Sequence, residues 1–304
     1  MKAGGLGLAL GSGSARGLAH IGVLKVFERE SLPIHLIAGT SIGALIGGAY
    51  AIGMTAREIE AVALATNIWR LVSLVDIARP TTALVNGRKV ERFIRQFAGG
   101  KTFADTKVPF ACVAVDVANG QEVVLREGDL AGAIRASIST PVIFAPVERD
   151  GQLLVDGAVL NSVPVDVARQ MGADVVVAVT NHGIPRSEMP VHFNVNDTDG
   201  ESLDAARIVA TGFTEIVSSR AVSLVRDRLR SLSVYQHAAG SLDLMLREIA
   251  EPRLRAADLV IAPQVDGVAS YSFYDAKRII AMGEKAAEAA VGGIHRLMAA
   301  RQIA

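Results

Sequence analysis

The chain turns sharply inside one apolar stretch, Leu36-Ile-Ala-Gly39-Thr-Ser41-Ile-Gly43-Ala-Leu-Ile-Gly-Gly-Ala-Tyr-Ala51. Residues 36–38 predict a buried strand, residues 39–43 a tight turn, and the residues after Ser41 a buried helix. The 21 residues from Leu36 to Ala56 include no Lys, Arg, Asp or Glu, and such a length could span a bilayer. A strand, a turn and a helix inside a protein core explain the pattern without lipid.

The turn itself reads Gly39-Thr40-Ser41-Ile42-Gly43, a Gly-x-Ser-x-Gly pattern. Such a pattern is typical of a nucleophile elbow, where a strained serine needs small neighbours so that the strand and the helix can pass each other. The helix that follows directs its amide groups and the positive end of its dipole at the serine oxygen. A plain glycine-rich turn gives the same five letters, but the position between a strand and a helix favours the elbow. Ser41 is therefore the candidate nucleophile.

A second glycine-rich turn, Gly11 to Gly17, directly follows a predicted strand at residues 6–10. A dinucleotide site is disfavoured, because the third glycine falls one position late and the next strand does not end in an acidic residue. Two interpretations remain open. The amides around Gly13 and Ser14 could form a nest for an oxyanion, or the segment could be a tight turn without a ligand.

The third candidate is Asp156, which opens an Asp-Gly-Ala sequence directly after a predicted strand at residues 153–155. A carboxylate at the end of a strand can reach the edge of the sheet where α/β proteins assemble their sites. A simple Asp-Gly turn is the alternative.

Predicted strands and helices alternate along the chain. Further strands are predicted at residues 108–117, 123–125, 175–180 and 259–261, and helices at 18–29, 86–98, after the cap at Thr55, and at 273–301. This alternation predicts an α/β fold, a three-layer α/β/α sandwich around a mainly parallel sheet. We take residues 4–168 as the catalytic core and residues 169–304 as the C-terminal part of the same domain, with a helical insertion at about 183–256.

Composition limits the function classes. The 304 residues hold 31 Lys plus Arg and 31 Asp plus Glu, so the formal net charge is zero. A neutral chain lacks the basic excess that binds nucleic acid or anionic lipid, and no nucleic-acid partner is expected. The single cysteine excludes an internal disulfide or a multi-cysteine metal site. Gly100-Lys101-Thr102 is no phosphate loop, because Arg95 stands where that motif requires its first glycine.

Together, residues 8–24, 39–43 and 156–158 resemble the patatin-like phospholipase family. The first block matches the glycine-rich block of the family, with Ser12 and Ser14 in place of two glycines. Residues 136–141 and 144–147 look like the family's segment before the aspartate, and residues 84–87 are similar to another family turn. The likeness covers about residues 4–168 well and resumes weakly at 257–283, whereas residues 183–256 resemble no family segment. The resemblance implies a patatin-like fold.

The resemblance also implies a serine–aspartate dyad that uses no histidine. Ser41 would attack an ester carbonyl, Asp156 would take its proton and later activate water, and the amides near Gly13 and Ser14 would hold the oxyanion. Arg16 would hold the loop or meet a substrate phosphate. The residues that match supporting positions of the family motifs are Gly11, Arg16, Gly17, Gly39, Gly43, Gly157 and Ala158.

The resulting hypothesis is a lipid acyl hydrolase of phospholipase A or lysophospholipase type, without metal or cofactor. We expect a cytoplasmic protein with peripheral membrane contact through apolar surface near Ser41. Its head group, acyl-chain length and oligomeric state are not predicted. One alternative is a Ser41, Asp156, His182 triad, whose chain order is that of α/β-hydrolases, although we interpret His182 as a loop residue and His20 as a loop-stabilising one. The other alternative is a non-catalytic lipid-binding or regulatory protein that retains the fold.

Overall fold

The computed structural model describes residues 5–65, 83, 85–181, 232–265, 267–270 and 272–303. The chain divides into two compact units, one made of Met1–Gly183 and Leu246–Ala304, the other of Ile184–Met245. The candidate site lies in the first unit. Most of the insertion predicted at about 183–256 lies outside the described residues, so its bounds and the division at residue 168 stay predictions.

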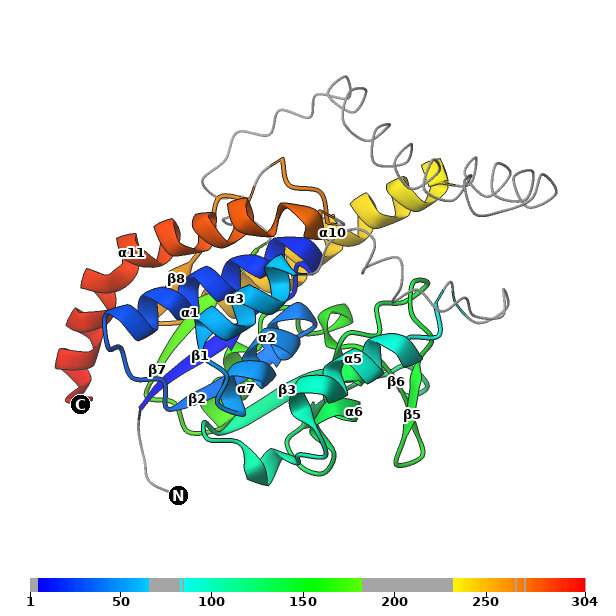
Figure 1. Ribbon diagram of the computed structural model, residues 1–304, viewed down its shortest axis with the longest axis horizontal. Coiled ribbons are helices and arrows are strands. Elements are labelled where there is room, and N and C mark those ends of the chain that lie inside the picture. The colour runs from blue at the N-terminus through cyan, green and yellow to red at the C-terminus, as the bar shows by residue number, and fades with distance from the viewer. Residues whose placement is uncertain are drawn as a thin grey trace. The chain divides into compact units, whose positions relative to one another are not determined.

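The described strands form one mixed sheet (Figure 1). They are β1 Leu6–Leu10, β2 Leu36–Thr40, β3 Phe110–Asp116, β4 Gln121–Leu125, β5 Val147–Arg149, β6 Gln152–Asp156, β7 Val175–Val179 and β8 Leu259–Ile261. Neighbours in the series β5-β6-β3-β2-β1-β7-β8 are hydrogen-bonded, and β4 also pairs with β3. Strands β1, β2, β3, β7 and β8 are parallel, whereas β4, β5 and β6 pair antiparallel.

Helices lie between these strands and after the last of them. The described α-helices are α1 Ala19–Arg29, α2 Ile42–Ala51, α3 Ala56–Leu64, α5 Arg88–Ala98, α6 Leu130–Ser137, α7 Val165–Gln170, α10 Leu232–Leu254 and α11 Ala276–Arg301. Short 3-10 turns are η1 Ser14–Leu18, η2 Phe103–Asp105, η3 Gly157–Val159 and η6 Phe273–Asp275. No described helix combines the length and the apolar character that crossing a membrane requires.

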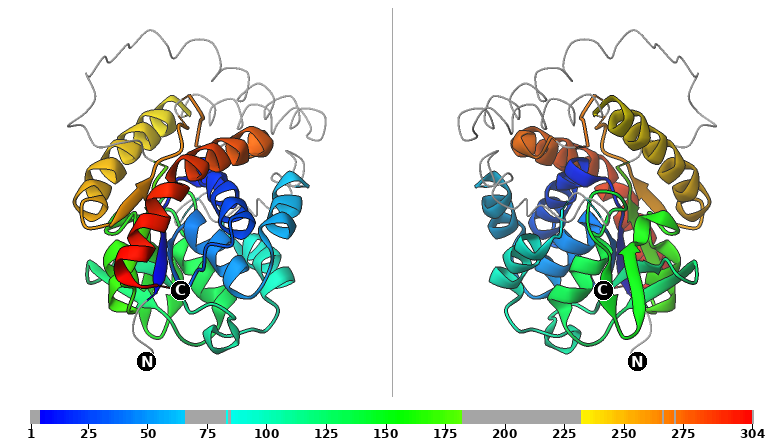
Figure 2. Two further views of the ribbon diagram at one scale, coloured as in Figure 1. Left: turned by 90° about the vertical axis from the view of Figure 1, so that its left-hand side faces the viewer. Right: turned by 90° about the vertical axis from the view of Figure 1, so that its right-hand side faces the viewer.

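Side chains alternate between two separate apolar cores, one on each face of the sheet. On β7, Val175, Val177 and Val179 face the larger core, while Val176 and Ala178 face the smaller one. This period of two is what an extended strand imposes. Buried residues of α1, α2, α5, α6 and α11 complete the larger core, and residues of α7 with the last turns of α10 complete the smaller core. In Figure 2, α1 and α11 pack side by side. The predicted three-layer α/β/α sandwich is confirmed.

The strands predicted at residues 6–10 and 259–261 have the predicted bounds. The helix predicted after Thr55 begins with a capping box, in which Glu58 N donates to Thr55 Oγ1 at 3.2 Å and Thr55 N donates to Glu58 Oε2 at 2.8 Å. The helix predicted at 273–301 begins three residues late, at Ala276, because residues 273–275 form a 3-10 turn.

Candidate active site

The ends of β2 and β6 meet along one edge of β3. Ile37 N donates to Pro109 O, and beyond the other end of β3 Val117 N donates to Leu153 O, both at 2.9 Å. Residues 109 and 117 lie an even number of positions apart, so in an extended strand their peptide groups point to the same edge. Strands β2 and β6 therefore approach each other end to end.

This arrangement brings the two candidate dyad residues together. Strand β2 is paired as far as Thr40, which lies opposite Val113. Strand β6 comes from the opposite direction and is paired as far as Asp156, which lies opposite Ala114. Since Val113 and Ala114 are consecutive, Ser41 and Asp156 leave the sheet at the same place.

Ser41 has the strained backbone that a nucleophile elbow requires. Its φ of 57° and ψ of −122° lie in a region that non-glycine residues rarely adopt. A Cβ added at Gly43 would lie 2.1 Å from Leu10 O, and one added at Gly39 would lie 2.6 Å from Gly43 O. Only glycine at both positions lets α2 start this close to β1 and β2, which is the steric reason for the spacing.

Ser41 is also fixed through its own amide. Ser41 N donates to Ser137 Oγ at 3.1 Å, and Ser137 Oγ in turn donates to Val113 O at 2.6 Å. On the preceding residue, Thr40 Oγ1 donates to Asn161 O at 2.9 Å. Both hydroxyl groups are buried, so the strained turn is held by satisfied hydrogen bonds.

The hydroxyl of Ser41 donates to Asp156 Oδ2 at 2.6 Å. The carboxylate is almost completely buried, with 3% of its surface exposed, and its other oxygen, Oδ1, accepts from Ala158 N at 2.9 Å. Burial raises the pKa of Asp156 to about 6, against the opposing effect of hydrogen bonds from Ser41, Ala158 and Thr140. A carboxylate with this pKa is about nine-tenths ionised at pH 7, and it can accept a proton from a serine hydroxyl.

The glycine-rich loop between β1 and η1 presents two amides without an acceptor. On either side of these amides, Ser12 N donates to Ser162 O at 2.8 Å and Ala15 N donates to Ser270 O at 3.0 Å. Gly13 N and Ser14 N find no acceptor among the described residues. Both residues are half-buried, and both have positive φ, 146° and 49°. Two unused neighbouring amides of this kind are an anion-binding arrangement.

The loop packs directly against the elbow. Gly17 lies so close to α2 that an added Cβ would be 2.1 Å from Ile42 Cγ2. Arg16 points its guanidinium back into the protein, since its Nε donates to Val268 O at 2.7 Å. This contact agrees with the loop-holding role of Arg16.

His20 and Asn181 stabilise the glycine-rich loop. His20 is fully buried and its Nε2 lies 2.7 Å from Gly11 O and 3.0 Å from Asn181 Nδ2. Asn181 Nδ2 also donates to Ser12 O at 3.2 Å. A Cβ added at Gly13 would clash with the Asn181 side chain. The loop-stabilising role predicted for His20 therefore matches its contacts.

Several residues of the site gave no clear signal in the sequence. Asn181 belongs to no sequence motif. Its neighbour His182 lies outside the described residues, as does Leu84 of the predicted turn at 84–87. Ser137 and Thr140 lie in a segment that is similar to the family, but no local pattern marks either residue. Gly157 is required by packing, because an added Cβ would lie 2.3 Å from Val113 O. No cluster of metal ligands occurs among the described residues.

A family model described as patatin-like phospholipase matches residues 8–169, more than half of the chain. The chain belongs to the patatin-like phospholipase family. The match covers the last residues of β1, the glycine-rich loop, the elbow and the Asp156 turn, but it ends before Asn181.

Relatives of this family member match somewhat more than half of the chain. It is 36% identical to an uncharacterized NTE family protein of Mycobacterium tuberculosis over 176 residues, which are 58% of this chain and 49% of that protein. It is 35% identical to patatin-like phospholipase domain-containing protein 6 of Homo sapiens over 181 residues, 57% of this chain and 13% of that protein. The chain thus spans about half, or much less, of the length of these relatives. The crystal structure of VipD from Legionella pneumophila aligns with 96% of this chain and 67% of that one, with a TM-score of 0.48 and 12% identity.

Proposed function

We propose that this patatin-like protein is a lipid acyl hydrolase, a phospholipase A or lysophospholipase-like esterase that uses a Ser41–Asp156 dyad. The observation that carries the proposal is the 2.6 Å hydrogen bond from Ser41 Oγ to the buried carboxylate of Asp156. The strained elbow supports it, because strain of this kind is concentrated at functional sites. The family to which the chain belongs supports a lipid as the substrate.

The reaction proceeds in two halves. Ser41 Oγ attacks the acyl carbonyl carbon while its proton passes to Asp156 Oδ2, and the carbonyl oxygen becomes an oxyanion that accepts from Gly13 N and Ser14 N. As the intermediate collapses, the bond to the leaving alcohol breaks and the alcohol takes the proton from Asp156. The acyl group stays on Ser41 as an ester. Water then gives a proton to Asp156 and attacks that ester, and the proton returns to Ser41 Oγ as the fatty acid leaves.

Each part of the site has a physical task in this scheme. A pKa near 6 leaves Asp156 ionised at neutral pH, yet basic enough to hold a proton transiently. An amide that donates to the oxyanion is worth roughly 3–4 kcal/mol in acyl transfer, or about 10²–10³ in rate. Among the described residues, no histidine hydrogen-bonds to Ser41 or Asp156. In the proposed scheme Asp156 is the base.

The test compares the parent protein with Ser41→Ala on nitrophenyl acyl esters and on phospholipid vesicles. We expect Ser41→Ala and Asp156→Asn to lower kcat by at least about 10³-fold while the circular dichroism spectrum stays unchanged. His182→Ala should leave the rate unchanged, and a large loss in that variant would indicate the triad instead. Parent-like activity of Ser41→Ala would refute the proposal.

A second measurement separates the enzyme from a non-catalytic lipid-binding protein with the same fold. A fluorophosphonate probe should form an adduct on Ser41 of the parent and none on Ser41→Ala. If the parent forms no adduct where a control serine hydrolase reacts completely, the binding protein is the correct interpretation.

A further inference from the structure

Asp156 Oδ2 accepts two hydroxyl groups, and the proposed mechanism uses only one of them. Ser41 Oγ donates to this oxygen at 2.6 Å, and Thr140 Oγ1 donates to it at 3.0 Å. Thr140 lies on the segment between α6 and β5, far from Ser41 in sequence. Its hydroxyl therefore contacts the reacting carboxylate from a different part of the fold.

We propose that Thr140 is a positioning residue of the Ser41–Asp156 dyad, whose hydroxyl fixes Asp156 Oδ2 against Ser41 and favours the ionised carboxylate. The inference rests on the proposed function and deepens it. With Ala158 N on Oδ1 and Thr140 on Oδ2, the carboxylate cannot rotate away from Ser41 without losing a hydrogen bond. A hydrogen bond from a neutral hydroxyl to a charged oxygen is also stronger than one to the neutral acid. Thr140 therefore opposes the rise in the pKa of Asp156 that burial causes.

The backbone beside Thr140 holds Asp156 as well. Asp156 N donates to Ser139 O at 3.0 Å, so two consecutive residues bind the same aspartate. The carbonyl of Thr140 accepts from Phe144 N at 2.9 Å, which closes the segment into a turn. Within this turn Val142 has a φ of 71°, a strained value for a β-branched residue that only strong surrounding contacts maintain.

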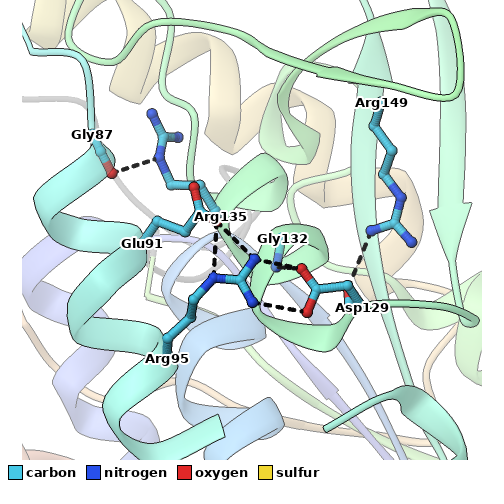
Figure 3. A network of polar contacts seen from close by, with 7 residues as sticks. All are labelled: Gly87, Glu91, Arg95, Asp129, Gly132, Arg135 and Arg149. Atoms are coloured by element: carbon cyan, nitrogen blue, oxygen red, sulfur yellow. Dashed lines mark hydrogen bonds and ion pairs between the residues drawn. The ribbon is translucent and has the colours of Figure 1, made fainter. Parts of the chain in front are cut away.

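Arg135 supplies those contacts. Its guanidinium is buried, with 2% of the residue exposed, and Nη1 donates to Ser139 Oγ at 2.6 Å while Nη2 donates to Ala145 O at 3.1 Å. Arg135 Nε donates to Gly87 O at 3.1 Å, the contact drawn in Figure 3. The guanidinium also lies 5.2 Å from the ring centre of Phe144. Arg135 thus connects both ends of the segment 139–145 to the turn before α5. These contacts fix the position of Thr140 within the segment.

The experiment compares Thr140→Val, which keeps the shape and removes the hydroxyl, with Thr140→Ser, which keeps the hydroxyl. In Thr140→Val we expect the acidic limb of kcat/KM to move upward by about one pH unit. We also expect kcat at pH 7 to fall about 3–10-fold with KM nearly unchanged, because the dyad loses ionisation and alignment. Thr140→Ser should keep both the acidic limb of kcat/KM and the value of kcat at pH 7 close to those of the parent. Thr140→Ala removes the same hydroxyl with a smaller side chain and is measured beside Thr140→Val, so that a folding defect in one variant does not decide the outcome.

A second readout does not depend on hydrolysis. The 13C carboxyl resonance of Asp156, assigned with Asp156→Asn, should titrate about one pH unit higher in Thr140→Val than in the parent. Thr106→Val is the matched control, since Thr106 Oγ1 donates to Phe103 O at 2.7 Å, away from the dyad. An Asp156 titration that is equal in the parent and in both hydroxyl-free variants would overturn the inference. A parent without activity would overturn the proposed function instead, while this titration still decides the role of Thr140.

Discussion

The buried dyad predicts that an inactive variant is more stable than the active protein. In Asp156→Asn the charge disappears, while the hydrogen bonds can be kept. The amide oxygen can accept from Ala158 N as Oδ1 does. The amide nitrogen can donate to the oxygens of Ser41 and Thr140, which rotate their hydroxyl protons elsewhere. The substitution therefore removes mainly the free energy that ionisation of a buried carboxyl costs.

The size of this free-energy cost follows from the difference between the pKa of Asp156 in the folded and in the unfolded protein. The pKa of Asp156 is about 6 in the folded protein, raised by burial, against an ordinary value of 3.8. Because the folded state binds the proton more tightly, ionisation destabilises it as pH rises through this interval. At 1.36 kcal/mol for each pH unit between the two values, the destabilisation reaches about 3 kcal/mol at pH 7.5. At pH 4, close to the ordinary value, the same relation leaves only a small fraction of this destabilisation.

Urea unfolding of the parent and of Asp156→Asn, measured at pH 7.5 and at pH 4, tests the argument. The variant should unfold at higher urea at pH 7.5, and the difference should nearly vanish at pH 4. Asp150→Asn is the matched control, because the Asp150 side chain is 87% exposed and its loss should change neither midpoint. An Asp156→Asn midpoint at pH 7.5 that equals or lies below that of the parent would refute the reasoning.

Three shorter predictions concern the glycine-rich turns and the surface. Gly43→Ala should lower the free energy of unfolding by at least about 2 kcal/mol, because its Cβ would meet Leu10 O. Gly100→Ala is the control: its Cβ meets nothing within 4 Å, so this variant should leave thermal unfolding unchanged. Ser14→Gly should stabilise the protein by about 1 kcal/mol in chemical unfolding, because Ser14 has a φ of 49°, whereas Ser12→Gly, without a positive φ, should not. Binding to anionic vesicles, measured by co-sedimentation, should weaken little between 0.05 and 0.5 M salt (roughly a threefold change in Debye length), because the net charge is zero. A strong salt dependence would contradict membrane contact through apolar surface.

The sequence predicts this fold well where one local pattern determines the structure. The strand at residues 6–10 is an apolar run that ends at glycine, and the capping box at Thr55 is closed by Glu58 three residues later. The elbow at Ser41 is predicted for the same reason, since the spacing of Gly39 and Gly43 follows from contacts within one turn and its adjacent strands. In each case the deciding interactions are between residues close in sequence or in a neighbouring strand.

The rest of the site depends on register, which no local pattern contains. That Asp156 meets Ser41 follows from β3 pairing with β2 as far as Val113 and with β6 from Ala114 onward. A shift of one residue in either ladder would turn the carboxylate to the other face of the sheet. Thr140 reaches Asp156 only because of this pairing, and Asn181 reaches the loop because β7 pairs with β1. Both residue types are common in ordinary turns.

The candidate site and the turn beside it contain several features that destabilise this part of the fold. Ser41 and Ser14 have positive φ, Val142 is a β-branched residue with positive φ, and Asp156 carries a charge in a buried position. Backbone strain of this kind costs of order 1–3 kcal/mol at each residue, and the carboxylate adds about 3 kcal/mol at neutral pH. A selection for stability alone would remove them, with glycine at the three positions of positive φ and asparagine in place of the aspartate. Their presence together, beside two amides that have no acceptor in the part of the chain that the structure describes, favours a working hydrolase over a protein that only retains the fold.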